Sequence, residues 1–73
     1  MSHDKLIYMA NQIAKFFESQ AEGSRRSGIA NHINDFWEPR MRAHFFEVVD
    51  AGGEGLDPIV IEAAEMIRRP KAA

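Results

Sequence analysis

Cysteine is absent from this sequence of 73 residues. The chain therefore cannot form a disulfide, supply a thiolate to a metal ion or use a sulfur nucleophile, which is compatible with a reducing cytoplasm. Long apolar runs are missing as well, and the N-terminal residues lack a basic segment followed by an apolar one. From these absences we expect a cytoplasmic chain that has neither a membrane span nor a signal peptide.

An excess of positive charge is also missing. Nine Lys and Arg residues against eleven Asp and Glu residues give a formal net charge of −2. Because nucleic-acid affinity depends mainly on neutralising phosphates, we expect no general nucleic-acid binding. A chain of this length buries roughly 60% of its extended surface when it folds. We therefore expect residues 1–73 to form a single domain of modest stability.

Apolar residues at three- and four-residue spacing predict the first helix, over residues 4–20. They are Leu6, Met9, Ala10, Ile13, Phe16 and Phe17. Ser2 or Asp4 can cap its start, since both side chains accept hydrogen bonds from free backbone N–H groups. Residues 21–28 lose this period and collect small, polar and charged side chains, which predicts a loop.

A second, shorter helix is predicted over residues 27–36, with Ser24 or Ser27 as its cap. Its inward-facing residues are Ile29, Ile33 and Phe36. A third helix follows Pro39 and ends at Gly52-Gly53, where glycine accepts the left-handed conformation that closes a helix. Its predicted inner face consists of Met41, Phe45, Val48 and Val49.

The pair Asp57-Pro58 marks the start of a fourth helix, because an acidic N-cap precedes a proline at the first helical position. We predict this helix over residues 59–68 and a frayed tail over residues 68–73. The fold class predicted from these patterns is all-α, a small bundle of about four short helices. Apolar residues cover most of the perimeter of the fourth helix, so we expect part of it to face another chain.

The segment that joins the second and third helices is Phe36-Trp37-Glu38-Pro39-Arg40-Met41-Arg42. Proline is disfavoured inside a helix, so one helix ends near Trp37 and another begins near Pro39. We expect Phe36 to be mainly inside and Trp37 to lie at the rim. Arginine beside aromatic residues and methionine is a composition enriched at protein–protein interfaces. The predicted partner-binding residues are Trp37, Arg40, Met41, Arg42, Ile59, Ile61 and Met66.

Candidate catalytic and metal sites are weak by comparison. His32 and Asp35 are three residues apart on one helix, but no second cluster completes a coordination shell, and His3 and His44 lie elsewhere. The glycine-rich residues 52–55 follow a helix and lack the Lys-Ser/Thr ending of a phosphate-binding loop. We therefore assign no catalytic, cofactor-binding or metal-binding residue to this chain.

Three segments, residues 9–17, 32–42 and 52–58, resemble the delta subunit of NAD-dependent, molybdenum-containing formate dehydrogenase. The resemblance extends over residues 5–67. It implies a non-catalytic accessory subunit that supports assembly, cofactor retention or stability of the large molybdenum-containing subunit. In that complex the large subunit holds a molybdenum bis-pterin guanine dinucleotide and iron–sulfur clusters, and another subunit holds FMN and the NAD site. Glu38 departs from the Asp expected there, which weakens the start of the third helix slightly.

Two other functions are compatible with the same residues. A homodimeric interaction module would bury the excess apolar surface against a second copy of the chain. A helix-turn-helix nucleic-acid binder would use the joint at Pro39, but its recognition helix would begin Arg40-Met41-Arg42 and continue into aromatic residues. That is a poor surface for reading a groove.

Overall fold

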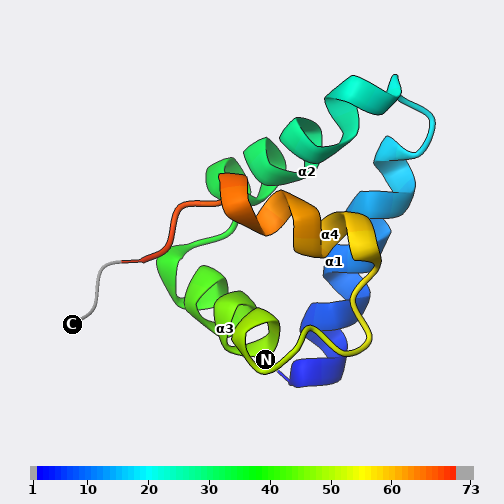
Figure 1. Ribbon diagram of the computed structural model, residues 1–73. Coiled ribbons are helices and arrows are strands. Elements are labelled where there is room, and N and C mark those ends of the chain that lie inside the picture. Colours follow the sequence, from blue (N-terminus) through cyan, green and yellow to red (C-terminus); the bar gives the residue numbers. More distant parts are fainter. Residues whose placement is uncertain (1, 71–73) are drawn as a thin grey trace.

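The computed structural model describes residues 2–70 and consists of helices joined by short turns. In chain order they are α1 (His3–Phe17), α2 (Glu22–Phe36), α3 (Pro39–Asp50), α4 (Pro58–Ala63) and the short 3-10 helix η1 (Ala64–Met66). Figure 1 shows α1 and α2 joined as a V, with α3 across the open end and α4 crossing between them. No strand occurs within residues 2–70, so the predicted all-α fold is confirmed.

Helix α1 begins at a serine cap. The Ser2 hydroxyl oxygen accepts a hydrogen bond from the backbone N–H of Lys5 at 3.2 Å, so Ser2 is the cap of the two candidates. The helix ends at Phe17, three residues before the predicted end. Its buried residues are Leu6, Ala10 and Ala14.

Helix α2 begins at Glu22, five residues before the predicted start, so most of the predicted loop over residues 21–28 is helical. Neither Ser24 nor Ser27 caps it, because the N-cap is Ala21 and makes no side-chain capping bond. The Ser27 hydroxyl instead donates to the Ser24 carbonyl at 3.2 Å inside the helix. Serine tolerates this arrangement in a helix. The loop was predicted from the lost apolar period and the small, polar side chains, and tertiary context overrides such local preferences.

The predicted boundaries of α3 are confirmed. Trp37 has an extended backbone with φ −90° and ψ 123°, and α3 starts two residues later at Pro39. After Ala51 the N–H of Gly53 donates to the Val48 carbonyl at 2.9 Å, and the N–H of Gly52 donates to the Val49 carbonyl at 3.0 Å. This is a Schellman closure, and Gly52 adopts φ +116°, which favours glycine.

Helix α4 starts at Pro58 after the N-cap Asp57, as predicted, and continues directly into η1, so the helical segment ends at Met66, two residues before the predicted end. The Asp57 side chain makes no capping bond. Its backbone N–H donates to the Asn11 side-chain oxygen at 2.8 Å, and the Asn11 amide donates to the Gly55 carbonyl at 2.9 Å. Asn11 therefore attaches the turn before α4 to α1.

The C-terminal segment contacts the bundle at residues 68 and 69, which belong to the predicted frayed tail. The Arg68 N–H donates to the Asn34 side-chain oxygen at 2.8 Å. Arg69 binds both carboxylate oxygens of Asp50, at 2.9 and 3.1 Å, and its guanidinium carbon lies 4.2 Å from the ring centroid of Phe46. Residues 71–73, the rest of the predicted tail, lie outside the described residues.

The core is built around α4, which contacts both α1 and α2. Val60, Ala63, Ala64 and Ile67 are buried, so the expectation that this apolar perimeter needs another chain is wrong for them. A short helix surrounded by its own neighbours can bury most of its circumference. Of the predicted partner-binding residues here, Ile59 is half-buried, whereas Ile61 and Met66 keep 38% and 50% of their surface exposed.

Candidate docking surface

The two aromatic residues at the joint occupy the opposite places from those predicted. Trp37 is only 5% exposed and its ring meets Phe45 edge-on, with centroids 6.1 Å apart. Phe36 is 74% exposed. Neighbouring residues on a helix point about 100° apart, so a regular helix directs two adjacent rings to different sides. The chain leaves the helix after Phe36, and the extended backbone at Trp37 turns the indole inward.

The two arginines of the joint also differ from each other. The Arg42 guanidinium donates to the Trp37 carbonyl at 3.3 Å and to the Arg68 carbonyl at 2.7 Å. It therefore holds the joint and the C-terminal segment together, and its predicted role as a donor to a partner is not supported by this placement. Arg40 is exposed, whereas Met41 is half-buried and packs against the core.

The seven predicted partner-binding residues do not form one surface. Arg40 and Met41 line a hollow that also contains Glu38 and His44. Ile61 lines a different hollow between α3 and α4. Trp37 is part of the core. Of these residues, Trp37 is therefore interior, whereas Arg40 and Met41 line one hollow and Ile61 lines another.

The most exposed aromatic side chains lie instead along α1 and α2. A groove of about 340 Å³ between these helices is lined by Gln12, Ile13, Phe16, Phe17 and His32. Phe16 is 66% exposed, and the His32 ring lies 4.9 Å from the exposed ring of Phe36. We define the aromatic surface as Ile13, Phe16, Phe17, His32 and Phe36.

Local packing explains why this surface forms. The Phe17 ring turns inward over Gly28, where a Cβ atom would lie 2.5 Å from the ring. Phe16, one residue earlier, points outward and meets Phe17 edge-on at 5.0 Å. On α2, His32 and Phe36 are four residues apart and share a helix face. Only glycine lets the two helices approach closely enough for Phe17 to fill the space between them.

Sequence reasoning placed Phe16 and Phe36 inside, and both placements are wrong. The missed signal is that each belongs to a pair of adjacent aromatics, Phe16-Phe17 and Phe36-Trp37. In both pairs one ring points away from the core, because adjacent residues lie on different sides of a helix. Phe45-Phe46 differs, because the guanidinium of Arg69 covers the second ring and both phenylalanines are buried.

The two ion pairs of the described residues do not involve the residues that line the groove. Arg26 on α2 pairs with Glu62 on α4 at 2.7 Å. Arg69 pairs with Asp50, and its hydrogen bonds lower the pKa of that exposed carboxyl from its usual value. The residues that line the groove include no acid, lysine or arginine. The aromatic surface is therefore suited to burying apolar side chains rather than to acid–base chemistry.

Two other features are absent from residues 2–70. No group of three or more His, Cys, Asp or Glu side chains is close enough to hold a metal ion. No helix in this part of the chain is long and apolar enough to cross a bilayer.

Fold and surface together define a small all-α domain with an apolar groove between its first two helices. The family model of the NADH-dependent formate dehydrogenase delta subunit FdsD matches residues 5–64, and the chain belongs to this family. The resemblance predicted from three sequence segments is thereby confirmed. A comparison with curated proteins gave no match. Glu38, the position that departs from the expected Asp, makes no side-chain capping bond, yet α3 begins at Pro39.

Proposed function

We propose that this chain is a non-catalytic accessory subunit that docks through its aromatic surface on the large molybdenum-containing subunit of a cytoplasmic formate dehydrogenase. Membership of the delta-subunit family supports association with other subunits of that enzyme. We choose this surface for docking because Phe16 and Phe36 are exposed beside an apolar groove. The cofactors, molybdenum bis-pterin guanine dinucleotide, iron–sulfur clusters, FMN and NAD, stay on the larger subunits in this proposal.

The size of the aromatic surface fits the centre of an interface. An aromatic side chain buries about 150–250 Å², so Phe16 and Phe36 together offer roughly 200–350 Å² of ring surface. A standard interface covers about 800 Å² on each partner. Large apolar anchors at the centre of such an interface usually carry most of the binding free energy. The remaining area would come from polar residues around the groove.

A subunit without its own chemistry can still control the yield of active enzyme. A protein that binds one state of its partner preferentially stabilises that state by the difference in binding free energy. In this proposal the delta subunit binds the cofactor-loaded conformation of the large subunit more tightly than the empty one. Loss of docking would then lower cofactor content and formate oxidation together.

The test is co-purification of the tagged chain with the other subunits from its native host. The double variant Phe16→Ala/Phe36→Ala should bind the large subunit at least tenfold more weakly, because it removes two exposed anchors. Both side chains are exposed, so the change in unfolding free energy should stay within about 0.5 kcal/mol per substitution. Recovery of molybdenum and formate oxidation in the purified material should fall in parallel.

The matched control is Ile61→Ala/Met66→Ala, which removes the exposed apolar side chains of α4 and η1. This control should leave co-purification unchanged. If the control abolishes binding and the aromatic variant does not, docking uses the α4 surface and the choice made here is wrong. Recovery of the chain alone, as a dimer that the aromatic variant dissociates, would assign the aromatic surface to a second copy of this chain.

A further inference from the structure

His3 and His44 form a close pair that the proposed docking does not use. His3 is the first residue of α1 and His44 lies in the middle of α3, and 41 positions separate them. The Nδ1 atom of His3 and the Nε2 atom of His44 are 2.8 Å apart, and the ring centroids are 4.7 Å apart. Tertiary packing therefore places two ring nitrogens from different helices next to each other at the surface.

The distance between the nitrogens suits two imidazoles that share one divalent cation. Bonds of about 2.0–2.1 Å to each nitrogen place the two nitrogens about 2.9 Å apart at right angles and about 3.3 Å apart in a tetrahedron. The observed 2.8 Å is a hydrogen-bond distance, close to the first value, and the two nitrogens must separate by about 0.5 Å to reach the tetrahedral spacing that zinc prefers. His3 is exposed and His44 half-buried, so small rotations of the two rings can bring both lone pairs onto one ion.

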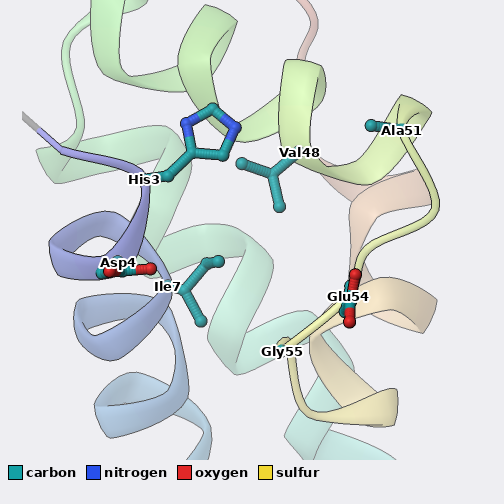
Figure 2. A pocket seen from close by; sticks show the side chains of 7 residues that line it. All are labelled: His3, Asp4, Ile7, Val48, Ala51, Glu54 and Gly55. Carbon is teal, nitrogen blue, oxygen red and sulfur yellow. The ribbon is translucent and has the colours of Figure 1, made fainter.

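The charges around the pair also favour a cation. His3 lines a hollow of about 490 Å³ together with Asp4 on α1 and Glu54 in the turn before α4. Figure 2 shows His3 extending from α1 towards α3, with Asp4 and Glu54 on opposite sides of the hollow. On its other side, His44 shares a hollow with Glu38 and Arg40. Among the residues that line these two hollows, three carboxylates stand against one guanidinium.

We propose that His3 and His44 form a two-imidazole chelate for a first-row divalent cation of the zinc type, with water at the remaining coordination positions. Imidazole nitrogen is a preferred ligand of these ions, in contrast to magnesium and calcium. Because no third protein ligand lies close enough within residues 2–70, the site is open to solvent and its cation exchanges freely. A bound ion joins the start of α1 to α3 and stabilises the folded chain by mass action.

The test is a calorimetric titration of the untagged full chain with Zn²⁺, repeated with Co²⁺. We expect one ion per chain in the titration and, in a separate thermal unfolding experiment, a midpoint that rises with zinc concentration. His3→Ala and His44→Ala should each weaken binding at least tenfold. The third histidine offers a matched control, since His32 packs on Phe36 and His32→Ala should leave binding unchanged.

Several outcomes would overturn the proposal. Absence of zinc binding at millimolar concentration would show that the pair is a hydrogen bond only. Equal weakening by all three substitutions would indicate unspecific surface binding. Loss of binding in His3→Ala but not in His44→Ala would assign the ion to the N-terminal segment alone. Circular dichroism of each variant confirms that it is folded before the titration is interpreted.

Discussion

Trp37 shows how much a single side chain contributes to this small domain. It is nearly fully buried, packs edge-on against Phe45 and lies where α2 ends and α3 is about to begin. Its backbone carbonyl also accepts a hydrogen bond from Arg42. Trp37 therefore fills part of the core with its ring, and its carbonyl accepts the hydrogen bond from Arg42 of α3.

The first prediction compares Trp37 with its neighbour. Trp37→Ala should lower the free energy of unfolding by about 3–5 kcal/mol, because it removes a large buried ring and leaves a cavity. Phe36→Ala should change it by less than about 0.5 kcal/mol, because that ring is exposed. Urea denaturation of the two variants measures the difference. Equal losses would show that Phe36 is covered in solution and would contradict the aromatic surface.

At the scale of elements, close contact between α1 and α2 depends on one glycine. Gly28 lies under the Phe17 ring, whereas nothing lies within 4 Å of a Cβ atom placed at Gly23, on the same helix. Both glycines are helical, and both lower the intrinsic stability of α2 relative to alanine by about 1 kcal/mol. Only Gly28 is required by packing.

The second prediction uses this difference. Gly23→Ala should raise the free energy of unfolding by about 0.4–1 kcal/mol, since alanine favours the helix and restricts the unfolded chain. Gly28→Ala should lower it by about 1–3 kcal/mol, because the added methyl group displaces Phe17 from the interface. Thermal unfolding followed by circular dichroism is a suitable measurement. A gain in stability at both positions would mean that Phe17 moves aside without cost.

At the scale of the whole molecule, polar side chains make hydrogen bonds between segments that are far apart in the sequence. Asn11 holds the turn before α4, and Asn34 binds the Met66 carbonyl and the Arg68 N–H. Arg42 connects the joint to the Arg68 carbonyl. With few residues available for a core, these attachments keep α4 and the C-terminal segment on the bundle.

The third prediction compares Arg42, which makes such hydrogen bonds, with Arg40 on the same helix. Arg42→Ala should lower the free energy of unfolding by about 1–2 kcal/mol, because two charge-assisted hydrogen bonds to carbonyl groups are lost. Arg40→Ala should change it by less than about 0.5 kcal/mol, because Arg40 is exposed. Amide hydrogen exchange should also speed up at residues 67–69 in the Arg42 variant only. Faster exchange there in both variants would contradict the role assigned to Arg42.

The sequence by itself determined the all-α class, the family, the joint at Pro39 and the stops and starts at Gly52 and Asp57. These features depend on local backbone chemistry, which nearby residues specify. Tertiary structure alone decided which ring of each aromatic pair is buried, that α4 is enclosed by its own fold, that Arg42 binds inward and that His3 meets His44. Such outcomes depend on how helices cross, and residues far apart in the chain set that crossing together.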